Sequence, residues 1–154
     1  MEGANLSGAI LIEANLHKAN LYRAKLLGAE LSRVNLSGAY LAKSNLSGTH
    51  LTEANLSGAD LSNGNLIDAN LTKADLSYGK LYLTNLLRAT LIRADLTNAN
   101  LLAAHLAEAN LELTDLSGAN LTNVDLRDAR LQNVVFCQTK MPDGALNNTR
   151  CPQL

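Results

Sequence analysis

The stretch SNLSGTHLTEANLSGADLSNGNL, from Ser44 to Leu66, carries a leucine at every fifth residue. The same spacing runs without a gap from Leu6 to Leu131, and Phe136 takes the next position. Five residues advance an α-helix by about 500°, so leucines at this spacing form no continuous stripe. On a flat strand, an odd spacing places alternate leucines on opposite faces. The repeat therefore predicts neither a helix nor a flat sheet.

A second column of small residues lies two positions before each leucine. Alanine fills most of these positions, from Ala4 to Ala129. The exceptions are small or β-branched: Val34, Ser44, Thr49, Gly64, Gly79, Thr84, Thr114 and Val124. Residues two apart on an extended segment share a face, so one small and one large side chain point inward together. A chain that turns the same way every five residues keeps all these pairs inside, which predicts a narrow solenoid.

The motif carried by Ala4-Asn5-Leu6-Ser7-Gly8 resembles the pentapeptide-repeat family, and the match extends to Phe136. The resemblance implies an all-β fold, a right-handed quadrilateral β-helix of about seven coils with one pentapeptide per side. Handedness and the four sides come from the resemblance and not from the spacing. We expect residues 1–136 to form the β-helix and residues 137–154 to form a short C-terminal cap.

A coil of 20 residues would stack outward residues that are 20 apart. Two such columns nearly alternate in sign, and a third is uniformly acidic: Glu13, Arg33, Glu53, Lys73, Arg93; Asp68, Arg88, Glu108; and Asp75, Asp95, Asp115. Opposite charges on neighbouring rungs are favourable by a few tenths of a kcal/mol each. The acidic column should repel itself unless Lys73 and Arg93 offset its charge across a corner.

The cap contains both cysteines of the chain, Cys137 and Cys151. They are either a disulfide or two unrelated thiols of a cytosolic protein. Their closeness in one short cap favours the disulfide, as does the resemblance of this end to exported cyanobacterial family members. A disulfide indicates an oxidising compartment, a thylakoid lumen or a periplasm, with the cytoplasm as the alternative. A helix is one option for the cap, with Met141 and Leu146 as plugs over the last apolar layer.

Composition and motifs argue against several functions. Thirteen basic and 14 acidic residues give a net charge of −1, which does not suit a nucleic-acid-binding protein. No apolar run is long enough to cross a membrane, and no basic-then-apolar leader begins the chain. His17, His50 and His105 fall on different sides of a 20-residue coil, so we expect no metal site. No phosphate-binding glycine loop or catalytic constellation is evident, so we expect neither a cofactor nor an enzyme.

One group of outward positions breaks the polar rule of the repeat. It comprises Ile67, Tyr78, Tyr82, Leu83, Leu87 and Leu102. Such a cluster is either a contact surface for a partner or tolerated variation at exposed positions. The leading hypothesis is a non-enzymatic, rigid interaction scaffold with an unknown protein partner, present as a monomer or a weak end-to-end dimer. The alternative is a DNA-mimicking protein that binds a topoisomerase such as gyrase, as some members of the family do.

Overall fold

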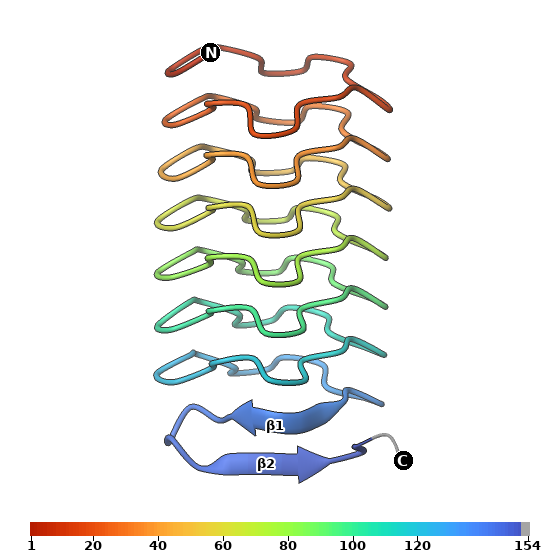
Figure 1. Cartoon of the computed structure of the whole chain (residues 1–154), viewed down its shortest axis with the longest axis vertical. Coiled ribbons are helices and arrows are strands. Elements are labelled where there is room, and N and C mark those ends of the chain that lie inside the picture. Colours follow the sequence, from red (N-terminus) through yellow and green to blue (C-terminus); the bar gives the residue numbers. More distant parts are fainter. Residues whose placement is uncertain (152–154) are drawn as a thin grey trace.

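The computed structural model describes residues 1–151, and these form a column of stacked coils (Figure 1). Parallel bridges join residues that are 20 apart, from Asn5 with Lys25 to Asn120 with Lys140. Each coil therefore contains 20 residues, and the rungs follow one another from the red end of the column to the blue end. The only strands of more than one residue in the described part are β1 (Phe136–Lys140) and β2 (Leu146–Thr149).

A β-turn closes every pentapeptide and makes the corners of the coil. The amide of Ala9, for example, donates to the carbonyl of Leu6 at 3.0 Å. The third residue of the turn has a positive φ, as type II turns require, and this residue is Gly8 in one turn and Glu13 in the next. Four such turns in 20 residues give the coil its four sides. The predicted four-sided coil is thus present in the backbone.

Asparagine or aspartate precedes most of the leucines and helps to set the corner. Its side-chain oxygen accepts a hydrogen bond from the amide two residues later, as Asn55 does from Ser57 at 3.0 Å. This local bond satisfies an amide of the turn that the coil would otherwise leave to solvent. Asparagine and aspartate favour turns because they can make this bond. The repeated Asn-Leu-Ser sequence is therefore a turn signal, and its polar residues have a structural role.

The predicted interior is confirmed. The leucines from Leu21 to Leu121 are buried with 0–1% exposure, and the small residues between them are buried with them. Thr84, Thr114 and Thr139 are also buried, and each hydroxyl donates to the carbonyl of a leucine on the preceding coil at 2.7–2.9 Å. No buried side-chain polar atom within residues 1–151 lacks a hydrogen-bond partner. The small column is therefore an interior layer that also tolerates hydroxyls.

The C-terminal segment is an antiparallel hairpin in place of the helix that we considered. β1 continues the coil, because Lys140 bridges Asn120, and β2 then returns beneath it as an extra rung (Figure 1). Strand pairing runs from Phe136 with Thr149 to Lys140 with Leu146. The turn between them is closed by Met141, which donates to Ala145 at 2.8 Å. β1 starts at the last core residue, so one strand lies on both sides of the predicted boundary at residue 136.

Only one of the two predicted plugs packs on the core. Met141 is half-buried and contacts the apolar interior. Leu146 is 64% exposed, so its assignment as a plug is wrong. The reason is the direction of β2, which covers the edge of the last coil with its backbone and leaves Leu146 facing solvent. Phe136 and Thr139 of β1 fill the last layer, with exposures of 9% and 0%.

Candidate functional site

Each corner of the column presents two side chains to solvent, and the second has a positive φ. Glycine, asparagine and aspartate adopt this backbone region more readily than bulky residues do. Tyr78 and Leu83 nevertheless occupy it, with φ of 56° and 54°. Their exposures are 68% and 39%. Two large apolar side chains therefore stand at corner positions where neither burial nor backbone preference favours them.

Three of the predicted patch residues meet at one corner, which we call the tyrosine–leucine corner: Tyr82, Leu83 and Leu102. The amide of Leu83 donates to the carbonyl of Leu102 at 3.1 Å, so the two lie on neighbouring coils. Tyr82 precedes Leu83 in the same turn and is 40% exposed. Leu102 is half-buried. Together they form a small apolar surface on an otherwise polar wall.

The other three patch residues lie at neighbouring corners. The bridge between Asn65 and Asn85 puts Ile67 and Leu87 on successive coils at the next corner, where both are half-buried. Tyr78 lies at the preceding corner. The predicted patch therefore spans three corners, separated by polar rungs, and the tyrosine–leucine corner is its most compact part.

Sequence reasoning missed two aromatic residues near this patch, on the side of the column between the corners of Tyr78 and Tyr82 or at its border. Tyr40 is 60% exposed and bridges Asn20 and Asp60 at the centre of that side. Tyr22 lies at the same corner column as Tyr82, three coils away. Counting every tyrosine modulo 20 would have found both, because residues that differ by a multiple of 20 stack.

The outward charges form ladders between coils. Ion pairs join residues 20 apart, which agrees with the predicted charge columns: Arg33 with Glu13 at 2.7 Å, Lys73 with Glu53 at 3.1 Å and Arg88 with Asp68 at 2.8 Å. His50 contacts Glu30 in the same way at 2.8 Å. These pairs are largely exposed and contribute little to stability, but they fix the orientation of the side chains on two corners and one side.

The acidic column is satisfied differently from our expectation. Lys73 pairs with Glu53 and not with the aspartates, and Arg93 forms no ion pair within residues 1–151. Each aspartate instead accepts the amide of its own turn at 2.8–2.9 Å: Asp75 from Ser77, Asp95 from Thr97 and Asp115 from Ser117. The negative charge of this column is thus held by turn amides and remains on the surface.

Hydrogen bonds from arginine lower the pKa of two aspartates. The side-chain hydrogen bond from Arg88 holds the pKa of Asp68 below its ordinary value. At the same corner, two coils beyond Arg88, Arg127 contacts Asp125 at 2.6 Å. Side-chain and backbone hydrogen bonds from Arg127 lower the pKa of Asp125 to about 2. Both carboxylates are therefore ionised at any ordinary pH, which suits a fixed charge and not a proton-transfer group.

The three histidines stay apart, as predicted. His17 lies 2.7 Å from the Ser37 hydroxyl, and His50 contacts Glu30, while His105 lies on a third side. No group of three or more potential metal-ligating residues occurs within the described part of the chain. No helix among residues 1–151 is long and apolar enough to cross a membrane.

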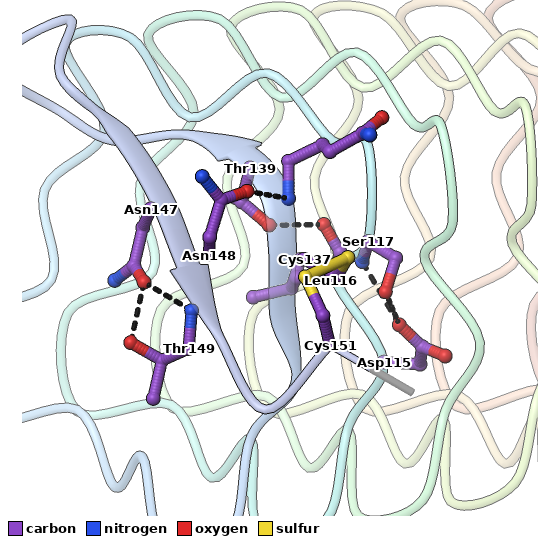
Figure 2. The surroundings of a disulfide bond; sticks show 10 residues. Asp115, Leu116, Ser117, Cys137, Thr139, Asn147, Asn148, Thr149 and Cys151 are labelled. Carbon is purple, nitrogen blue, oxygen red and sulfur yellow. Dashed lines mark hydrogen bonds between the residues drawn. A yellow bond between two sulfur atoms is a disulfide. The ribbon is translucent and has the colours of Figure 1, made fainter. Parts of the chain in front are cut away.

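The disulfide joins Cys137 on β1 to Cys151 after β2, with Cα atoms 4.6 Å apart (Figure 2). The bond holds the returning strand against the last coil. Its surroundings are well tied by hydrogen bonds: the Asn148 side chain accepts the amide of Gln138 at 3.0 Å, and the Thr139 hydroxyl donates to Leu116 at 2.7 Å (Figure 2). No free cysteine occurs among the described residues.

Comparison with known families identifies the repeat. The family model for pentapeptide repeats matches the chain in 8 copies, over residues 1–38, 29–66, 51–86, 69–101 and 94–133. No curated protein matches the chain.

Several solved structures are similar to this chain. HetL, a pentapeptide repeat protein involved in heterocyst differentiation regulation from the cyanobacterium Nostoc sp. strain PCC 7120, is 36% identical. That match covers 96% of this chain and 76% of HetL, with a TM-score of 0.50. A pentapeptide repeat protein from the Arabidopsis thaliana thylakoid lumen is 35% identical over 66% of this chain and 70% of its own, with a TM-score of 0.64. Trypsin-treated QnrB1, a plasmid-mediated fluoroquinolone resistance protein, is 22% identical. That match covers 86% of this chain and 77% of QnrB1, with a TM-score of 0.62, and at this identity it indicates a shared fold alone.

Proposed function

This chain belongs to the pentapeptide-repeat family, and we propose that it is a rigid, non-enzymatic scaffold that binds another protein in an exported compartment. Members of the family fold as right-handed quadrilateral β-helices and are generally structural or interaction proteins. The observation that carries the proposal is the tyrosine–leucine corner, where Tyr82 and Leu83 are 40% and 39% exposed on a polar wall. Aromatic side chains are enriched at the centres of protein interfaces.

The rigidity of the column supports binding without rearrangement. The carbonyls of Tyr82 and Leu102 accept amide hydrogen bonds from Asn63 at 2.9 Å and Leu83 at 3.1 Å. The backbone under the corner is therefore held by the coils on both sides. A surface that is already ordered loses little conformational entropy when a partner binds. Outward side chains can thus be presented at fixed spacing.

The backbone at Leu83 is unfavourable for a leucine. Its φ of 54° lies in the left-handed region, which costs a bulky L-residue roughly 1–2 kcal/mol. Leu113 has a φ of 61° and a similar exposure, so strain alone does not distinguish Leu83. Leu83 differs in its place beside Tyr82 and Leu102, and this grouping supports a contact surface there.

The exported compartment is supported by the disulfide. Disulfides persist in a lumen, a periplasm or an extracellular space, and they are rare in a reducing cytosol. Cys137 and Cys151 are bonded, and a relative at 35% identity is a thylakoid-lumen protein. We therefore propose a thylakoid lumen or a periplasm as the compartment.

A second candidate function is DNA mimicry toward a topoisomerase such as gyrase. The column of Asp75, Asp95 and Asp115 favours it, because the three carboxylates are spaced one coil apart like charges along a backbone. Against it stands the mixture of signs on the other walls, with four ion pairs between arginine or lysine and a carboxylate within residues 1–151. A supercoiling assay with purified gyrase distinguishes the two: the scaffold proposal expects no inhibition.

The test of the scaffold proposal compares two leucines that have the same exposure and backbone conformation but lie at different corners. Leu83 and Leu113 are 39% and 41% exposed and have φ of 54° and 61°, and they lie at diagonally opposite corners. We expect discrete proteins of a lumenal or periplasmic extract to bind the parent and Leu113→Ser but not Leu83→Ser, with unchanged circular dichroism. Equal retention by all three proteins, or none by any, would refute the proposal. Sedimentation of the same proteins checks the predicted monomer or weak end-to-end dimer.

A further inference from the structure

All four tyrosines of the chain lie on one side of the column or at its two bordering corners. Tyr40 is at the centre of this side, Tyr78 at one border, and Tyr22 and Tyr82 at the other. We call this surface the tyrosine side. It includes the tyrosine–leucine corner and extends it toward the N-terminal coils. Tyrosine is frequent at contact surfaces because it combines a large apolar ring with a polar hydroxyl, so the gathering of all four on this side and its borders favours a contact surface.

The tyrosine side also carries cations that form no ion pair among residues 1–151. Lys18, Arg23, Lys43 and Lys80 point outward there, against two acidic residues, Glu2 and Asp60, in the same coils. None of the five ion pairs within residues 1–151 lies on this side. The other walls neutralise their charges by ladders between coils, so the tyrosine side has an excess of positive charge on a chain whose net charge is −1.

Two of these cations are arranged around an aromatic ring. The Arg23 guanidinium carbon lies 5.1 Å from the centre of the Tyr22 ring, and the Lys43 ammonium lies 6.0 Å from it. Cation–π contacts of this kind hold the two charged groups beside the ring at one corner. Beside them is a shallow hollow of about 480 Å³ between Tyr22 and Tyr40, and its border carries Lys18 together with two carboxylates, Glu2 and Asp60. The hollow has the size of a pocket for one or two side chains.

We propose that the tyrosine side binds an acidic segment of another protein; this inference rests on the proposed scaffold function and names the chemistry of its partner. Carboxylates of the segment would pair with Arg23, Lys43 and Lys80, and an apolar side chain would enter the hollow beside Tyr40. Charge complementarity of this kind sets partner choice and association rate. An anionic membrane surface suits the site less well. A peptide can place an apolar residue opposite Asp60 at the centre of the side, whereas a membrane would present a uniformly negative layer there.

Intrinsic fluorescence tests this assignment directly. The chain has no tryptophan and four tyrosines, all on this side, so its emission reports this surface alone. The probe is a short synthetic peptide of glutamate and leucine, free of aromatic residues, titrated into the full chain. We expect a saturable change in tyrosine emission that weakens as salt rises toward about 0.5 M, because screening shortens the range of the attraction. Peptides of lysine and leucine, and of serine and leucine, should give no change.

Charge reversals locate the site. Arg23→Glu and Lys43→Glu should each weaken binding of the glutamate peptide roughly fivefold or more. The matched control is Arg93→Glu. Arg93 lies at the diagonally opposite corner, has the same positive φ, and forms no ion pair among the described residues. The control variant should leave the affinity unchanged.

Three results would overturn the inference: no saturable change, equal weakening by Arg93→Glu, or preference for the lysine peptide. Binding to phosphatidylglycerol vesicles in place of the peptide would assign the side to a membrane and would also overturn it. Self-association of the parent that Lys43→Glu removes would make the occupant a second copy, again against the proposal. The scaffold function is judged separately by the Leu83 and Leu113 variants, which need no acidic probe.

Discussion

Replacing Leu71 by alanine should destabilise the column strongly. Leu71 is fully buried, with Leu51 and Leu91 stacked above and below it, also at 0% exposure. The change removes three carbon groups, worth about 0.8 kcal/mol each on transfer from water. A residual cavity of about 50 Å³ adds about 1.2 kcal/mol, so we expect a loss of about 3–4 kcal/mol.

The neighbouring rungs cannot collapse into the cavity. Leu71 donates to Thr90 at 2.7 Å, and Leu51 donates to Asn70 at 2.7 Å, so the coils are fixed on both sides. Equilibrium denaturation in guanidinium, followed by circular dichroism, measures the loss. The control is Leu11→Ala in the same column, because Leu11 is only half-buried and should cost less than about 2 kcal/mol. Equal costs for the two variants would refute the layered core.

Three further predictions concern the interior, the cap and the surface charges. Ala69→Leu should cost about 1–3 kcal/mol in denaturation, because Ala69 is fully buried in the small column; a variant as stable as the parent would contradict that. Thiol titration of unreduced protein should find no reactive cysteine, and reduction of the Cys137–Cys151 bond, of sequence separation 14, should cost about 3 kcal/mol; two reactive thiols before reduction would contradict it. The pKa of Asp125 is lowered to about 2, so its stabilising effect is present above pH 3.8 and is lost as pH falls toward 2. An NMR titration should show that low pKa and its return toward 3.8 in Arg127→Gln; an unchanged pKa in the variant would refute the assigned cause.

Much of the fold could be predicted from the sequence because each repeat has the same pattern of a leucine preceded, two positions earlier, by a small residue. A leucine and a small residue two apart identify the interior, and charges 20 apart, such as Glu13 with Arg33, identify the stack. The cap could not be predicted in the same way. After Phe136 the repeat ends. The sequence Pro142-Asp143-Gly144 predicts a turn, but no periodic pattern follows it to show that residues 146–149 form a strand that leaves Leu146 exposed. The division at residue 136 stays a prediction.

The surface was predicted less completely than the core. Ile67, Leu87 and the tyrosine–leucine corner were visible as apolar residues in polar slots. Tyr22 and Tyr40 were missed because each is a single exception among polar neighbours, and only stacking modulo 20 brings them to one side with Tyr82. Interior positions obey a steric limit that every repeat must meet, whereas outward positions are free to vary. For that reason the role of the patch requires a direct measurement.

Site-specific photo-crosslinking in the native compartment is the most direct test of a rigid scaffold that binds through one side. A photoreactive phenylalanine derivative replaces Leu83 in one variant and Leu113 in the other, two positions with matching exposures of 39% and 41% at opposite corners. The scaffold proposal predicts a discrete protein adduct from position 83 and none from position 113. Adducts of equal yield from both positions, or an adduct from position 113 alone, would contradict it.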